Sequence, residues 1–320
     1  MMSPTRRFER AQSFYPRSFA SRRFRADMAT VNTYFWVGQL SEGGLAKALK
    51  AADPSVDPVV GLSLPPRFER RLGHDFAALT QMARSHTQWR RLSTLVMLAS
   101  ALERYLAAVS RIAVESDPAL EPGFPKVVDG AKLTKKGLAL PPRDLTGLVV
   151  GEWSQRIALF SRLFGTSPRE LLSAEGELEF IRKTRNRVAH ALGVDDGFGL
   201  ATPDAGAAVL GMMMEARRPD MMPAARVSDD RLTALMKSAQ GVVDAVDEQL
   251  LREHIGSYEI IATYLSWNAS PSDFESRAGI VLEGHRRGHD QRFSNVVGEL
   301  VGSGLGSTYI KGLEAYVRAL

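Results

Sequence analysis

The stretch FIRKTRNRVAH, residues 180–190, places three polar groups of different chemistry in one predicted helix. Arg185 supplies a permanent cation, Asn186 an amide and His190 a titratable imidazole. On a helix these groups lie within about one and a half turns of each other. Together they are the parts needed to hold a phosphate group and to move a proton. The helix that carries them is expected over residues 175–192.

A helical wheel of this segment shows an apolar stripe with the arginine inside it. The stripe consists of Leu178, Ile181, Val188 and Leu192. Arg185 falls within the stripe, whereas Asn186 and His190 are four residues apart and stack on one flank. A guanidinium on a buried stripe is costly unless it is paired or meets a ligand. Two interpretations follow: an arginine that snorkels or pairs with a core carboxylate, or an arginine that binds a ligand.

A second charged residue lies on an apolar stripe elsewhere in the chain. Residues 75–115 are predicted to be helical, and Glu103 falls between Ala99 and Leu106 on the apolar face. A carboxylate in that place needs a partner. We therefore expect Glu103 to orient Arg185 or to accept a hydrogen bond from His190, with a plain buried ion pair as the alternative.

The rest of the chain also predicts helices rather than strands. Apolar residues recur at helical spacing in several further segments, near 149–164, 228–251, 255–267, 271–284, 290–302 and 307–320. There is no alternation of strands and helices that would indicate a parallel sheet. The expected fold class is mainly α.

Composition restricts the chemistry. The chain has 320 residues and no cysteine, which excludes disulfides, thiolate zinc sites and a cysteine nucleophile and fits the cytoplasm. No uninterrupted apolar run of about 18 residues occurs, so no membrane span is expected. The chain lacks a P-loop and a nucleophile elbow, and the pair His285 and His289 lacks the further ligands that a metal needs. We expect neither a metal nor a cofactor.

The positive charge is concentrated at the N-terminus. Residues 1–25 contain seven arginines and one glutamate, a net of +6, whereas the whole chain carries +5. The remainder is therefore close to neutral, and RNA contacts there would need local clusters. Residues 1–27 interleave arginines with aromatic residues and are predicted to form a disordered arm. The arm would either bind RNA or be an extension upstream of a true start at Met28.

The Arg-Asn-x-x-Ala-His pattern from Arg185 to His190 resembles the signature of the HEPN superfamily. The similarity extends over residues 75–265 and looks like the branch associated with ribonuclease-L-type and bacterial defence systems. It is carried further by Glu103, by Trp153 and Arg156, by Leu163-Phe164-Gly165, and by the segment from Asp244 to Tyr258. The resemblance implies an HEPN-like helical bundle at 75–265, with an N-terminal extension at 28–74 and a C-terminal helical extension at 266–320. It also implies a homodimer that is formed through the signature helices.

Many active HEPN proteins are metal-independent endoribonucleases, and others are catalytically silent. The resemblance thus implies RNA as the substrate, a toxin, stress or phage-defence role, and a neutralising or regulatory protein as a further partner. The catalytic residues would be Arg185, Asn186 and His190, supported by Glu103. RNA-binding residues would be Arg182, Lys183, Arg187 and Arg156. The alternative is a non-catalytic module that dimerises and binds RNA or a nucleotide.

Overall fold

The computed structural model describes residues 7–68, 75–121, 128–138, 144–191, 226–279 and 288–320. Within these ranges the regular structure is helical and contains no strand, which confirms the mainly α prediction.

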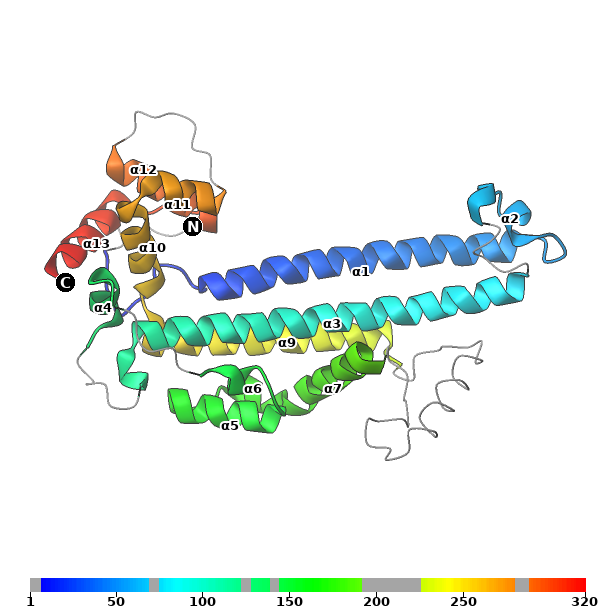
Figure 1. Cartoon of the computed structure of the whole chain (residues 1–320), viewed down its shortest axis with the longest axis horizontal. Coiled ribbons are helices and arrows are strands. Elements are labelled where there is room, and N and C mark those ends of the chain that lie inside the picture. Colours follow the sequence, from blue (N-terminus) through cyan, green and yellow to red (C-terminus); the bar gives the residue numbers. More distant parts are fainter. Residues whose placement is uncertain (1–6, 69–74, 122–127, 139–143, 192–225, 280–287) are drawn as a thin grey trace, which may run out of the picture. The chain divides into compact units, whose positions relative to one another are not determined.

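Most of the predicted helices occur near their expected positions (Figure 1). The long helices are α1 (Phe19–Ala51), α3 (Phe76–Ser116), α7 (Glu175–Ala191) and α9 (Asp229–Leu250). Shorter helices are α2 (Pro58–Gly61), α4 (Gly130–Lys135), α5 (Trp153–Phe164), α6 (Arg169–Ser173), α10 (Tyr258–Ala269), α11 (Pro271–Ala278), α12 (His289–Val301) and α13 (Ser307–Ala319). One π-helical turn, Leu251–Ile255, joins α9 to the loop before α10.

The chain divides into two compact units, each built from separate parts of the sequence. The first unit comprises Met1–Ala26, Leu102–Glu175 and Gln240–Leu320, and the second comprises Asp27–Ala101 and Gly176–Ala239. Helices α1, α3 and α9 contribute residues to both units. The range 75–265, expected to be one HEPN-like domain, therefore draws its residues from both.

The second unit holds the motif helix α7. Its apolar core collects side chains from four helices, and these include Phe35, Leu92, Leu95, Leu178, Ile181, Leu232 and Leu235. Within this unit α1 and α3 lie side by side and run in opposite directions (Figure 1). The Arg90 guanidinium joins them, because its Nε and Nη2 donate to the carboxylate of Glu42 at 2.7 and 3.0 Å. Arg91 donates to both oxygens of Asp229 at 2.8 and 2.6 Å, which ties α3 to the start of α9.

In the first unit the N-terminal segment is packed, so the prediction of a disordered arm is wrong for residues 7–26. Phe14, Tyr15 and Phe24 are buried in the core. The Phe8 ring lies against the rings of Tyr309 and Tyr316, with centroids 5.4 and 5.2 Å apart. The aromatic side chains that suggested contacts with RNA bases instead pack against other residues of the protein.

One arginine of this segment is used entirely for internal contacts. The Arg10 guanidinium donates to the carboxylate of Asp129 at 3.0 Å, to the Ser116 hydroxyl at 2.8 Å and to the Ile255 carbonyl at 2.8 Å. Its own carbonyl accepts from Ser257 N at 3.0 Å. Gly256 permits this approach, because it has a φ of 53° and a Cβ there would lie 2.3 Å from the Arg10 carbonyl oxygen.

Two buried carboxylates accept hydrogen bonds from the beginning of α1. Asp247 of α9 accepts from Ser18 N at 2.9 Å and from the Ser18 hydroxyl, and Glu259 of α10 accepts from Phe19 N at 2.9 Å. These donors belong to the first turn of α1, where backbone N–H groups have no partner inside the helix. The positive end of the helix dipole also favours negative charge there. The two acidic side chains therefore act as a cap supplied from distant parts of the chain.

The buried cap predicts a pH dependence of stability. Burial raises the pKa of Glu259 to about 8, with a contribution from nearby Asp247, and Arg22 and the Phe19 N–H oppose the shift. A carboxyl whose pKa is raised on folding stabilises the fold most at a pH below its unfolded value. That contribution is lost as the pH rises from about 4.5 towards 8. Glu259→Gln keeps an acceptor for Phe19 N and removes the titration. Its free energy of unfolding, measured by urea denaturation, should fall less than that of wild type between pH 5 and 8. Equal slopes for the two proteins would show that Glu259 stays ionised.

Among the described residues, one helix has the length and composition of a membrane span. Helix α3 contains an 18-residue window of mean hydropathy 1.4, and 56% of that window is buried within the protein. Core helices of soluble proteins pass the same test, so this helix gives only weak evidence for a membrane.

Candidate functional site

The motif lies on a continuous helix that is anchored by its apolar face. Helix α7 runs from Glu175 through Ala191, and its residues Leu178, Ile181 and Thr184 are buried. Asn186 and His190 are therefore separated by one helical turn, as the sequence predicts. The side chain of His190 and the residue Leu192 lie outside the part of the chain that the structure describes.

Arg185 occupies the edge of the buried stripe and is partly exposed rather than enclosed. Its Nη1 donates to the Asn186 side-chain oxygen at 3.0 Å. This bond holds a partly buried guanidinium and the neighbouring amide in one orientation. An amide oxygen is a neutral acceptor, so the bond to Asn186 does not cancel the positive charge of Arg185.

The other basic residues of α7 differ in availability. Arg182 is held by Glu179, with N–O distances of 2.9 and 2.5 Å, and its side chain is only 17% exposed. Lys183 lies 3.6 Å from the same carboxylate, but its side chain is 67% exposed. Arg187 is exposed. Of the predicted RNA contacts on this helix, Lys183 and Arg187 are therefore the accessible ones, whereas Arg182 serves mainly as the partner of Glu179.

Two of the predicted site residues, Glu103 and Arg156, belong to the first unit and pair with each other. Arg156 is buried, donates to the Gly151 carbonyl at 3.0 Å and stacks on Trp153. Its Nη1 and Nη2 lie 3.4 Å from Glu103 Oε1. Burial contradicts the prediction that Arg156 contacts RNA. The structure shows Glu103 in an ion pair with Arg156, as the alternative of a buried ion pair predicts, and a contact of Glu103 with Arg185 stays a prediction.

Acidic residues on α7 were missed as part of the site. Glu179 holds Arg182 and Lys183, and Glu177 pairs with Arg231 of α9 at 3.0 Å. The Arg231 guanidinium also lies 5.5 Å from the centre of the Phe180 ring. The spacing of Glu179 three and four residues before Arg182 and Lys183 is a recognisable signal for such pairs. These carboxylates orient the basic residues and also reduce the net positive charge of the helix.

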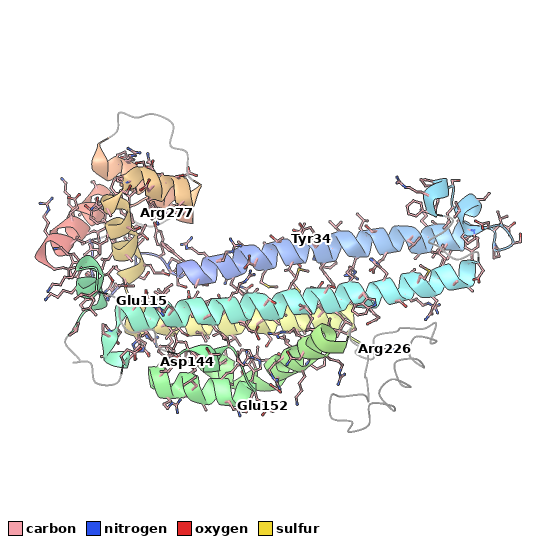
Figure 2. The ribbon with its side chains drawn as sticks, in the orientation of Figure 1. Tyr34, Glu115, Asp144, Glu152, Arg226 and Arg277 are labelled. Atoms are coloured by element: carbon pink, nitrogen blue, oxygen red, sulfur yellow. The ribbon has the colours of Figure 1, made fainter. Side chains whose placement is uncertain are left out.

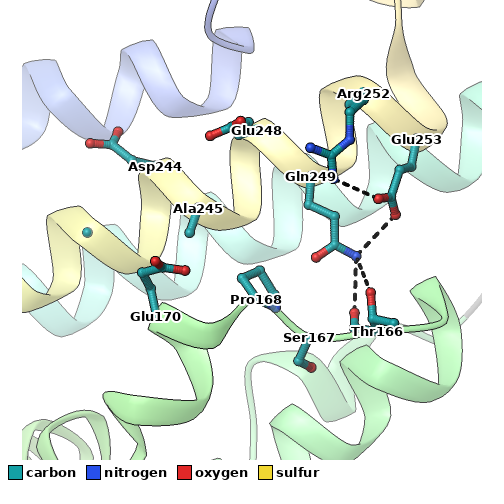
Figure 3. Close-up of a pocket in the computed structure, with 11 residues that line it drawn as sticks. Thr166, Ser167, Pro168, Glu170, Asp244, Ala245, Glu248, Gln249, Arg252 and Glu253 are labelled. Atoms are coloured by element: carbon teal, nitrogen blue, oxygen red, sulfur yellow. Dashed lines mark hydrogen bonds and ion pairs between the residues drawn. The ribbon is translucent and has the colours of Figure 1, made fainter.

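A polar cavity of about 540 Å³ in the first unit is a poor candidate for RNA (Figure 3). Gln249 crosses its floor, and its Nε2 donates to the Thr166 carbonyl at 3.1 Å and to the Thr166 hydroxyl at 3.2 Å. The acidic residues that line the cavity are Glu170, Asp244, Glu248 and Glu253, against the single basic residue Arg252. Carboxylates of this number repel a phosphate backbone.

A second cavity, of about 460 Å³, contains an aspartate–histidine pair. His254 Nδ1 lies 2.9 Å from Asp117 Oδ2, and the hydrogen bond to His254 lowers the pKa of Asp117. Sequence alone suggested a capping or surface role for His254. The His254 Nε2 atom is buried without a hydrogen-bond partner, and the ring packs near Phe164. An imidazole that is held by Asp117 and whose side chain is only 13% exposed serves mainly to order the chain at this place.

The described residues contain no group of three or more histidine, aspartate or glutamate side chains that could hold a metal ion. Of the pair considered from the sequence, His285 and the side chain of His289 lie outside the described residues. Comparison with known proteins adds no further assignment, since no family model, no curated protein and no solved structure matches the chain.

Proposed function

We propose that this protein is a metal-independent endoribonuclease of the HEPN type, with its site on α7. The observation that carries the proposal is the bond between Arg185 and Asn186, which orients a partly buried guanidinium five residues before His190 on the same helix. The accessible side chains of Lys183 and Arg187 lie on the same helix and supply additional positive charge for an RNA backbone.

The proposed reaction uses the ribose 2′-hydroxyl as the nucleophile. His190 removes the hydroxyl proton, and imidazole suits this task because its ordinary pKa of about 6.5 lies near neutral pH. The 2′ oxygen forms a bond to the adjacent phosphorus while the bond from phosphorus to the 5′ oxygen breaks. The leaving oxygen takes a proton from water or from the imidazolium of a second copy. The products are a 2′,3′-cyclic phosphate and a 5′-hydroxyl.

Arg185 is proposed to bind the phosphate and to stabilise the charge that builds on its non-bridging oxygens. A guanidinium can donate two parallel hydrogen bonds to a phosphate, and partial burial strengthens the interaction. Asn186 fixes the direction in which the guanidinium points. Because one chain brings a single pair of Arg185 and His190 to this helix, a homodimer that joins two such pairs in one cleft would supply both phosphate capture and proton transfer.

The decisive assay incubates the purified protein with mixed RNA in excess EDTA. Cleavage that continues in EDTA and leaves cyclic phosphate ends is the expected result. Activity that requires added Mg²⁺ would rule out the proposed chemistry. RNA binding without any cleavage would favour the non-catalytic binding module, provided that mass spectrometry finds no co-purified inhibitory partner.

A further inference from the structure

Helix α1 carries an apolar face that its own unit leaves in water. Between Val31 and Leu45 its inner face is buried through Val31 and Phe35. The opposite side is also apolar, and its exposed fractions are 63% for Tyr34, 54% for Trp36, 55% for Val37 and 79% for Leu40. Figure 2 labels Tyr34 on α1. A helix that is apolar on both sides is typical of one with neighbours on both sides.

Two glycines follow this exposed face and are not explained by packing inside the chain. Gly43 and Gly44 lie in the interior of α1, where glycine destabilises a helix by roughly 0.5–1 kcal/mol relative to alanine. A Cβ atom at either position would meet nothing within 4 Å. By contrast, a Cβ at Gly38 would lie 2.3 Å from Arg90 Cδ, so that glycine is required by its neighbour. Two successive glycines beside an exposed apolar face leave room for the close approach of a second helix.

We propose that this face of α1 binds the same face of a second copy of the chain, with the two helices antiparallel. The large exposed residues Tyr34, Trp36 and Val37 precede the small residues Ser41, Gly43 and Gly44. A two-fold axis between Gly38 and Gln39 would place the large half of each helix against the small half of the other. A parallel pair would place large against large and leave the glycines facing each other.

The wheel positions give definite contacts for this register. Thr33 would lie opposite Gly44, and Val37 opposite Leu40. Trp36 would cover Gly43 and Leu40 of the other copy. The Tyr34 ring would enter between Ser41 and Leu45 on the other flank, where Leu45 is 37% exposed. Each large exposed side chain on this face thus finds a small or apolar neighbour.

The exposed area agrees with a moderate dimer. At these exposures the four apolar side chains leave roughly 400 Å² in water per chain, within the range of functional patches on monomers. Two copies would hide roughly 800 Å² from these side chains, and the backbone around the glycines adds to it. The total approaches the roughly 1,000 Å² that a specific interface needs. This surface is separate from the Arg185 site, and the inference does not depend on catalysis. The α1 contact and the pairing of two α7 helices proposed above are different two-fold contacts, so both together would assemble four or more copies, and loss of the α1 contact alone would leave dimers paired through α7.

The first test is Gly44→Leu, measured by sedimentation velocity at micromolar concentration. A leucine there adds apolar surface and improves helix propensity, so nonspecific association would increase. The proposal expects the reverse, a dimerisation weakened by roughly tenfold or more because Thr33 is displaced. Gly176→Leu is the matched control, since Gly176 also lies in a helix of this unit with nothing within 4 Å of a Cβ. Circular dichroism should show both variants folded.

The register is tested with single cysteines, which are unambiguous because the natural chain has none. Leu40→Cys lies near the two-fold axis and should form a disulfide between copies under mild oxidation. Ala48→Cys should not, because its two copies would lie roughly 28 Å apart along the helices. Disulfides at Ala48 would indicate a parallel pair and overturn the proposal. A wild type that stays monomeric would also overturn the proposal. In that case, free reaction of Leu40→Cys with maleimide would show that the face is exposed to water. Protection of Leu40→Cys from maleimide would show that another segment of the same chain covers it.

Discussion

A chain that begins at Met28 is expected to lose the folded state of the first unit. Residues 7–26 supply three buried aromatic side chains, Phe14, Tyr15 and Phe24. Burying one such side chain stabilises a fold by roughly 1.5–3 kcal/mol, so the three together contribute an amount comparable to the roughly 5–15 kcal/mol net stability of a typical domain. The deletion should therefore unfold the unit rather than weaken it slightly.

The deletion also leaves two acidic groups buried without their partners. Asp247 loses the Ser18 backbone and hydroxyl donors, and Glu259 loses the Phe19 N–H. Asp129 loses the Arg10 guanidinium, although the Tyr316 hydroxyl still donates to it. A buried polar group left unsatisfied costs roughly 1–3 kcal/mol, and more when it is charged. These losses add to the missing aromatic core.

The measurement compares thermal unfolding and limited proteolysis of wild type and three shortened or substituted chains. Removal of residues 1–6 takes away none of the groups described above and should keep the Tm. Phe24→Ala should lower the Tm through the cavity it creates, and removal of residues 1–27 should abolish the cooperative transition of the first unit. An unchanged Tm after the long deletion would restore the interpretation of residues 1–27 as a dispensable arm.

The misreading of this segment has a physical cause. Interleaved arginine and aromatic residues have the same composition whether they contact RNA or pack on a protein surface. The partners that decide between the two, such as Asp247, Gly256 and Glu259, lie more than 200 residues away in the chain. Local spacing carries no information about contacts at that separation.

The helical periodicity of apolar residues predicted which face of a helix is buried, but it did not predict the partners of the charged residues on that face. The stripe on α3 placed Glu103 correctly as a largely buried carboxylate that needs a cation, since its side chain is 19% exposed. The cation is Arg156. The position of Arg156 in the sequence of its own helix does not show whether its side chain is buried or on the surface. Helix α1 was harder to predict because apolar residues on both sides obscure a single stripe, and the chain around Val31 to Leu40 was compatible with a strand.

The motif helix was predicted most fully, because its information is local. Arg185 and Asn186 are adjacent, and the bond between them needs no distant element. The pairing of Glu179 with Arg182 is equally local and was available from the spacing. Local sequence does not show which surface faces this helix, because that surface comes from distant residues or from another copy of the chain.

The second large effect is expected on RNA cleavage. His190→Ala should lower the cleavage rate by roughly 10²–10⁴-fold, the usual range for loss of a general base, while the fold is kept. Arg185→Ala should have an effect of similar size on kcat, because the charge it stabilises develops in the transition state. Arg185→Lys should recover only part of the rate, since an ammonium group cannot donate two coplanar hydrogen bonds to phosphate.

Arg187→Ala is the matched control for Arg185→Ala, because it removes the same group two residues later on the same helix. Arg187 is exposed, so its loss should mainly raise KM by weakening the attraction to the RNA backbone. Asn186→Ala should fall between the two, because it frees the guanidinium from the orientation that the 3.0 Å bond maintains. Equal effects of Arg185→Ala and Arg187→Ala would reduce Arg185 to a general electrostatic contribution.

An RNA with a single 2′-deoxy substitution at the cleavage position separates this chemistry from other nuclease mechanisms. The substitution removes the attacking oxygen and leaves the phosphate, the base and the charge of the backbone unchanged. It should block cleavage at that position, while binding, measured by fluorescence anisotropy, stays within about twofold of the all-RNA substrate because the phosphates supply most of the affinity. Cleavage at the substituted position would require water as the nucleophile, and His190 could not then act on a ribose hydroxyl. A loss of binding instead would show that the protein recognises the 2′-hydroxyl before any reaction takes place, which is a property of an RNA-binding module.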